Sequence, residues 1–145
     1  MKKEYQRIIV PIDGSEQSKK AAEKACFFAK ATDIELLAIH VINIPDLPSE
    51  FEHEDEITYQ QIYALLKREG NMYFDEIKKI AEKYDVPIST KILEGHPHNE
   101  IIKEASKNDL IVMGHKGKTG LDHILLGSNT ENVIRHTDSD IMIIR

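Results

Sequence analysis

Short apolar runs alternate with segments of helical period along the whole of this chain. Buried strands are expected at residues 5–13, 34–42, 86–95, 109–114 and 140–145, and helices at about 16–31, 57–84, 98–108 and 128–136. The strand at 34–42 is apolar nearly throughout, which is typical of parallel sheets covered on both faces. Helices that join parallel strands form right-handed crossovers. The alternation therefore predicts an α/β fold, a single-domain three-layer sandwich with a five-stranded parallel sheet.

Length, charge and cysteine content limit the number of domains, the kinds of partner and the cellular location that we expect. A chain of 145 residues suits one domain over residues 1–145. The net charge of -6 gives no reason to expect a nucleic acid partner. The single cysteine, Cys26, excludes an internal disulfide and lies in an apolar helical run. No apolar run reaches membrane-spanning length and no signal peptide is recognised, so we expect no membrane association and a cytoplasmic location.

Two features interrupt the alternation. Residues 43–56 contain two prolines and many acidic side chains without any period, which predicts an exposed loop. A lid or a partner-docking segment is the alternative, because long loops in compact domains are often functional. Gly70 weakens the middle of the helix over 57–84, where it allows a kink.

The string "GKT" at 117–119 matches the end of the phosphate loop of P-loop NTPases. That loop requires a glycine five positions before its Gly-Lys pair, and Val112 occupies this position. No helix begins at Thr119, since Gly120 follows, and the segment comes after the fourth strand rather than the first. We therefore exclude a P-loop.

The glycines after the fourth strand make a different pattern. Two residues separate Gly114 from Gly117, and after nine further residues Gly127-Ser128 opens a helix. Backbone amides at a helix start attract anions, and glycine lets backbone approach them closely. Two lysines, Lys116 and Lys118, add positive charge. These segments could cradle a polyphosphate from two sides; alternatively, the glycines only form turns and Ser128 only caps its helix.

The pattern Gly-x-x-Gly-x9-Gly-Ser after an apolar strand resembles the ATP-binding signature of the universal stress protein family. "IIVPIDGS" resembles that family's first strand and turn, and "LLGSNTENVIRHTDSDIMIIR" its closing helix and last strand. The resemblance covers the full chain as one nucleotide-binding domain. It implies a Rossmann-like sheet of order 3-2-1-4-5, similar to adenine nucleotide alpha hydrolases. It also implies ATP or another adenine nucleotide, with Mg²⁺, and a homodimer formed through the last strand, 140–145.

In that order the reversal lies between the first and fourth strands, where open α/β sheets bind ligands. The resemblance and the glycine pattern together predict these nucleotide-binding residues: Pro11, Ile12, Asp13, Val41, Met113, Gly114, His115, Gly117, Lys118, Gly127, Ser128 and Asn129. Asp13 would accept a hydrogen bond from ribose or adenine, and the Val41 backbone would contact the base. Asp13 could instead be only a turn residue, and Val41 only core. Where the family has a small residue, His115 could contact phosphate or partly fill the site.

No residue is placed convincingly as a general base, and we assign no catalytic or metal-binding residue. His96 and His98 would supply only two ligands to a metal. The resemblance implies an adenine nucleotide-binding module of stress response or regulation with an unknown protein partner, and the lack of an assigned base predicts at most slow ATP hydrolysis. The alternatives are an ATPase or phosphotransferase that uses Asp13 or His115 to orient water, and a dimeric interaction protein that needs no nucleotide.

Overall fold

The computed structural model describes residues 4–43, 56–116 and 126–145. The elements in chain order are β1 (Arg7–Pro11), α1 (Glu16–Thr32), β2 (Glu35–Ile42), α3 (Glu56–Lys83), β3 (Ile88–Glu94), α4 (Pro97–Glu104), β4 (Asp109–Gly114), α5 (Ser128–His136) and β5 (Asp140–Ile144). The strands form one parallel sheet in the order β3-β2-β1-β4-β5. The predicted fold class and strand order are confirmed.

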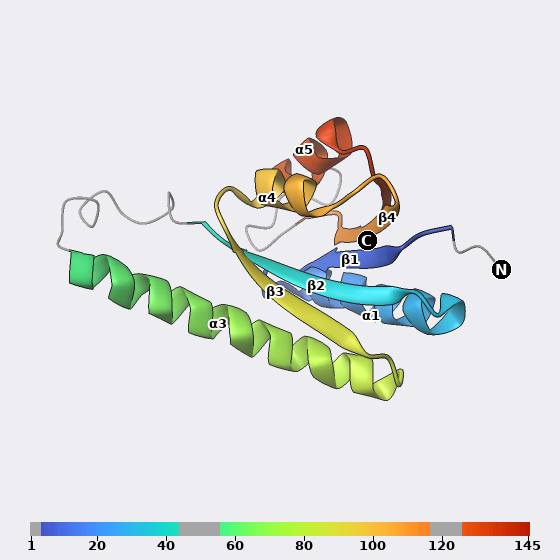
Figure 1. The fold of residues 1–145 in the computed structure, drawn as a ribbon, viewed down its shortest axis with the longest axis horizontal. Helices are drawn as coiled ribbons and strands as arrows, with labels where there is room; N and C mark the ends of the chain where they lie inside the picture. The colour runs from blue at the N-terminus through green and yellow to red at the C-terminus, as the bar shows by residue number, and fades with distance from the viewer. Residues whose placement is uncertain (1–3, 44–55, 117–125) are drawn as a thin grey trace.

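Helices cover both faces of the sheet, as Figure 1 shows: α1 and α3 lie on one side, and α4 and α5 on the other. Successive residues of β1 point to opposite faces, so Ile8 and Val10 pack with α1 and α3. Ile9 lies on the other face, in a second cluster with Ile101 of α4 and Val133 of α5. Both faces of the inner strands β2, β1 and β4 are largely buried, which explains why these strands are mostly apolar, whereas the edge strand β3 alternates with exposed polar residues.

Local signals set the limits of several elements. The Ser15 side chain accepts a hydrogen bond from the Ser18 amide and caps the start of α1. After Thr32 the helix is terminated by Asp33, which lies in the left-handed region with φ 55°. Pro97 occupies the first turn of α4, which ends at Glu104, four residues before the predicted end. The predicted loop at 43–56 lies almost wholly outside the described residues.

Gly70 does not interrupt α3, which runs continuously from Glu56 to Lys83. It is a buried position where the helix crosses His40 of β2. A Cβ atom at Gly70 would lie 2.6 Å from Cδ2 of His40. This glycine therefore permits close contact between helix and sheet, and the expectation of a kink is wrong. Across the described residues, no helix has the length and apolarity that crossing a membrane requires.

Candidate functional site

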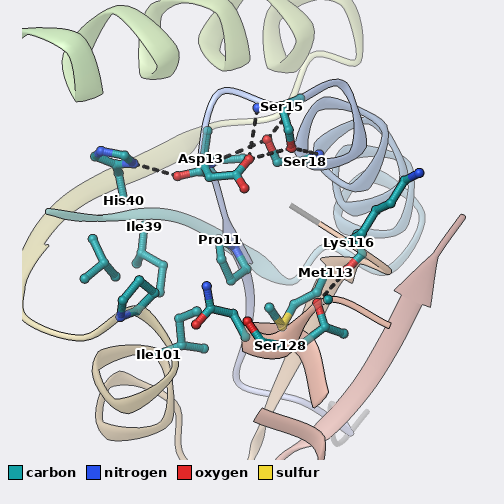
Figure 2. A pocket seen from close by; sticks show the side chains of 17 residues that line it. Pro11, Asp13, Ser15, Ser18, Ile39, His40, Ile101, Met113, Lys116 and Ser128 are labelled. Carbon is teal, nitrogen blue, oxygen red and sulfur yellow. Dashed lines mark hydrogen bonds between the residues drawn. The ribbon is translucent and has the colours of Figure 1, made fainter. Parts of the chain in front are cut away.

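The strand order reverses between β1 and β4, since β1 leads to β2 on one side and β4 leads to β5 on the other. A cavity of about 200 Å³ opens at the carboxyl ends of these strands. It is shown in Figure 2 and lined by Pro11, Ile12, Asp13, Ser15, Ser18, Ile39, His40, Val41, Pro97, Ile101, Met113, Gly114, Lys116, Gly127, Ser128, Asn129 and Thr130. Such a crevice is where open α/β sheets bind their ligands.

One wall of the cavity is the turn after β1. Gly14 has a φ of 84°, a conformation that favours glycine. Oδ1 of Asp13 accepts hydrogen bonds from the Ser15 amide at 2.9 Å and the Ser15 hydroxyl at 2.5 Å. Ser18 donates its hydroxyl to the Ser15 carbonyl, 2.9 Å away, and Figure 2 shows the three side chains together. These bonds hold the Asp13 carboxylate at the cavity wall. Asp13 can therefore both stabilise the turn and face a ligand in the cavity.

The opposite wall is the start of α5. Gly127 is the N-cap and supplies no side-chain cap, so the amides of residues 128–130 have no acceptor within the helix. The positive end of the helix dipole adds to their attraction for an anion. The Thr130 hydroxyl donates to the Gly114 carbonyl at 3.0 Å, and the Gly127 amide donates to the His115 carbonyl at 2.8 Å. Residues 114–116 and the start of α5 therefore lie side by side, although ten or more residues separate them in sequence.

Gly114, which lines the cavity, also has a packing role in the fold. A Cβ atom here would lie 2.9 Å from Cβ of Gln17 and 3.1 Å from its backbone carbonyl carbon and oxygen. The absence of a side chain therefore lets α1 pack closely over β4. His115 is also turned toward α1: its ring is nearly buried, and Nδ1 lies 3.2 Å from Oε1 of Gln17. The His115 side chain does not line the cavity.

The third wall comes from β2. Ile39 and Val41 lie on the same face of the sheet as Met113 and Ile101, and give this side of the cavity an apolar surface. His40 points to the other face, where its Nδ1 is 2.7 Å from the Ile12 carbonyl oxygen (Figure 2). The imidazole also meets the Tyr73 ring edge-on, with centroids 5.4 Å apart. This contact links the turn after β1 to α3.

Comparison with known proteins identifies the family. The family model described as the universal stress protein family matches residues 4–145. The chain belongs to the universal stress protein family. Universal stress protein MJ0531 of Methanocaldococcus jannaschii is 42% identical over 97% of this chain and 82% of that protein. The solved structure of MJ0577 from the same organism is 32% identical, with a TM-score of 0.80 over 97% of this chain and 96% of that one. A universal stress protein solved in complex with cAMP is 26% identical, with a TM-score of 0.65 over 97% of each chain.

In this universal stress protein, most of the residues predicted to bind nucleotide line the one cavity: Pro11, Ile12, Asp13, Val41, Met113, Gly114, Gly127, Ser128 and Asn129. Gly117 and Lys118 lie outside the described residues. The cavity also contains residues outside that predicted set: Ser15, Ser18, Ile39, His40, Pro97, Ile101, Lys116 and Thr130. Of these, Lys116 was expected only to add positive charge near the phosphates. Ile39 and His40 directly precede Val41 in the same strand, so their place near the cavity could have been predicted from the prediction for Val41. No sequence signal places Pro97 and Ile101 there, because α4 reaches the site only through packing.

Few ionisable side chains line this cavity among the described residues. Asp13, His40 and Lys116 are its ionisable lining residues within the described part of the chain. No group of three or more His, Cys, Asp or Glu residues there is arranged to hold a metal ion. Cys26 is fully buried in the core away from the cavity, and burial raises the pKa of its thiol to about 11. The thiol is therefore protonated at neutral pH and is a poor nucleophile.

Proposed function

We propose that this universal stress protein binds an adenine nucleotide, ATP among them, in the cavity between β1, β4 and α5. The observation that carries the proposal is the approach of residues 114–116 to the uncapped start of α5, beside the reversal of strand order. A helix start of this kind supplies amides and a favourable dipole for phosphate. A relative of this chain has been solved with cAMP, which is an adenine nucleotide.

The cavity suits a nucleotide with its nucleoside inside and its phosphates toward α5. Ile39, Val41 and Ile101 offer an apolar surface for adenine, and the Asp13 carboxylate can accept a hydrogen bond from ribose. The volume of about 200 Å³ is below the usual range of about 300–1,000 Å³ for enclosed ligands, so part of the ligand would lie at the open mouth. The phosphates would lie there, near Lys116 and Ser128.

A bound Mg²⁺ ion is compatible with this donor set. Mg²⁺ usually takes one or two protein carboxylates together with substrate phosphates and water. Among the described lining residues, Asp13 is the one carboxylate that could bind the ion. The other ligands of the ion would be phosphate oxygens and water. The ion would neutralise phosphate charge when the nucleotide is bound.

We further propose a regulatory role in which occupancy, rather than rapid turnover, is the signal. Asp13 already accepts two hydrogen bonds from Ser15, and the His115 ring contacts Gln17. Asp13 is engaged by the turn after β1 and the His115 side chain does not line the cavity, so we assign neither as the base that would activate water. A role in stress response follows from the family, while a cytoplasmic location stays a prediction of the sequence.

We also propose a homodimer that pairs β5 with its copy. β5 is an edge strand, and its residues Ile141, Met142, Ile143 and Ile144 are only partly buried. An aliphatic edge strand with unpaired backbone groups is suited to pairing with a second chain. The exposed Asp140 at its beginning accepts a hydrogen bond from the Tyr5 hydroxyl at 2.8 Å, which ties this carboxylate to its own subunit.

The nucleotide proposal can be tested with Gly127→Asp. The backbone at Gly127 has φ -63° and ψ 152°, which any residue can adopt, and aspartate is a good N-cap. The variant should keep α5 but repel phosphates. Isothermal calorimetry should show ATP affinity falling at least about tenfold. Gln6→Glu makes the same charge change at the exposed opposite end of the sheet and should leave the affinity unchanged.

Mass spectrometry of small molecules released from freshly purified protein gives an independent measurement. Adenine nucleotides should be released from the wild type and depleted in Gly127→Asp. If no adenine nucleotide is retained, and calorimetry with ATP, ADP and AMP gives no signal, the proposed function is wrong.

A further inference from the structure

The helices α4 and α5 lie side by side on one face of the sheet (Figure 1). Pro97 at the start of α4 and Ser128 at the start of α5 both line the cavity. His98 is the second residue of α4, and Asn129 is the second residue of α5. Nδ1 of His98 lies 3.3 Å from Oδ1 of Asn129, and Asn129 lines the cavity. A polar pair thus joins the two helix beginnings at the edge of the site.

The chemistry of this pair determines which atom donates. In the arrangement seen here, Oδ1 of Asn129 faces Nδ1 of His98, and because this oxygen can only accept a hydrogen bond, Nδ1 is the donor in this arrangement. The Asn129 amide then has its oxygen engaged by His98 and its NH₂ group available as a donor. Without a partner, the amide could turn over and present its oxygen instead.

We propose that His98 is a positioning residue that orients the Asn129 amide to donate to the phosphate chain of a bound nucleotide. This inference rests on the proposed function and concerns the selectivity of the same site. In the orientation set by His98, the Asn129 NH₂ group adds to the backbone donors at the start of α5. In the opposite orientation, the amide oxygen would repel phosphate oxygens. The pair therefore favours nucleotides with phosphates over the bare nucleoside.

The neighbouring ring of His96 helps to keep His98 in place. The two ring centroids are 4.7 Å apart with an interplanar angle of 57°. Close contact on one side restricts rotation of the His98 side chain. The side chain therefore loses less conformational entropy when it forms the hydrogen bond with Asn129.

Three variants separate positioning from direct contact: His98→Ala, Asn129→Ala and the double variant. Calorimetry would measure the affinity of each for ATP and for adenosine. Asn129→Ala should lower ATP affinity about tenfold, the scale of one hydrogen bond to a charged group. His98→Ala should lower it about threefold to tenfold, and the double variant should be no weaker than Asn129→Ala. Adenosine affinity should be unchanged in all three, and His98→Gln, whose amide can donate, should restore part of the loss.

Nitrogen-15 NMR of the imidazole provides a second readout that a purely structural role would not produce. Neutral His98 should carry its proton on Nδ1 in the wild type and lose this preference in Asn129→Ala. A proton on Nε2 in the wild type would overturn the proposal.

The outcomes also separate this inference from nucleotide binding itself. If wild type binds ATP but His98→Ala binds it equally well, or if the losses add in the double variant, the positioning role is wrong and the proposed function stands. If adenosine affinity falls with that of ATP, the selectivity is wrong. If wild type binds no adenine nucleotide, both proposals fail.

Discussion

Replacing Asp109 should test what holds β1 and β4 together below the cleft. Asp109 begins β4 opposite Arg7, the first residue of β1, and its side chain is only 1% exposed. Its carboxylate accepts hydrogen bonds from Nη2 of Arg7 at 2.9 Å, from Nε of Arg7 at 3.3 Å and from the Ser106 amide at 2.9 Å. Nη2 of Arg7 also donates to the Glu104 carbonyl at 2.9 Å.

The change Asp109→Asn keeps the size but removes the charge and turns one oxygen into a donor. One of the donors from Arg7 or Ser106 would then face another donor. Breaking a fully buried ion pair costs about 3–5 kcal/mol. The Arg7 side chain is 31% exposed and can recover some hydration, so we expect a loss of about 2–3 kcal/mol. For a domain of this size, the loss corresponds to a melting temperature lower by about 5–10 °C.

The effect should depend on pH in a defined direction. Burial would raise the pKa of Asp109, but the hydrogen bonds from Arg7 and Ser106 and the guanidinium charge outweigh it and lower the pKa. A lowered folded-state pKa stabilises the protein fully above the unfolded pKa of about 3.9. This contribution is lost as the pH falls below that value toward the folded pKa. The difference between wild type and Asp109→Asn should therefore be constant from about pH 6 to 7 and shrink below about pH 4.

Urea unfolding followed by circular dichroism at several pH values would measure this difference. Asp138→Asn makes the same charge change at an exposed position and should alter stability by less than about 0.5 kcal/mol. Because the pair lies at the opposite end of the strands from the cavity, ATP affinity per folded molecule should not change. If Asp109→Asn were as stable as wild type at pH 7, or if its deficit grew in acid, our account of this network would be wrong.

Three further changes probe the core, the thiol and the sheet edge. Gly70→Ala should destabilise the protein by about 1–3 kcal/mol in thermal unfolding, because the new methyl group meets the hydrogen-bonded His40 ring; a gain in stability would show that the ring moves aside. Cys26 should react with Ellman's reagent only as fast as the protein unfolds, because its thiol is buried and its pKa is raised to about 11; rapid labelling of folded protein would contradict this. Ile143→Lys should convert the proposed β5 dimer to a monomer in light scattering, with Lys107→Ala as the exposed control; an unchanged mass would exclude pairing through β5.

The location of the site could be predicted because it depends on chain order and strand type. Apolar runs covered on both faces imply a parallel sheet, and the resemblance to the family supplied the strand order. The order then places residues 11–13 and 113–114 at neighbouring strand ends. The helix start at Gly127-Ser128 was also visible, since a glycine before a helix leaves its first amides without a side-chain cap.

The long-range side-chain contacts of the fold could not be predicted in the same way. His115 turns to Gln17, and Arg7 pairs with Asp109, across roughly a hundred residues of sequence. Gly70 looked like a weak point in a helix, yet its hydrogen atom faces an imidazole ring from β2.

By itself, the sequence determined the layers of this protein, the strands that end at its cleft and the helix that faces them. These follow from periodicity and from local backbone chemistry, which act over a few residues. Only the tertiary structure decided which side chains line the cavity, why Gly114 carries none, and that His98 meets Asn129. Such choices depend on close packing between elements, and packing is set by the shapes of neighbours that the chain brings together only when it has folded.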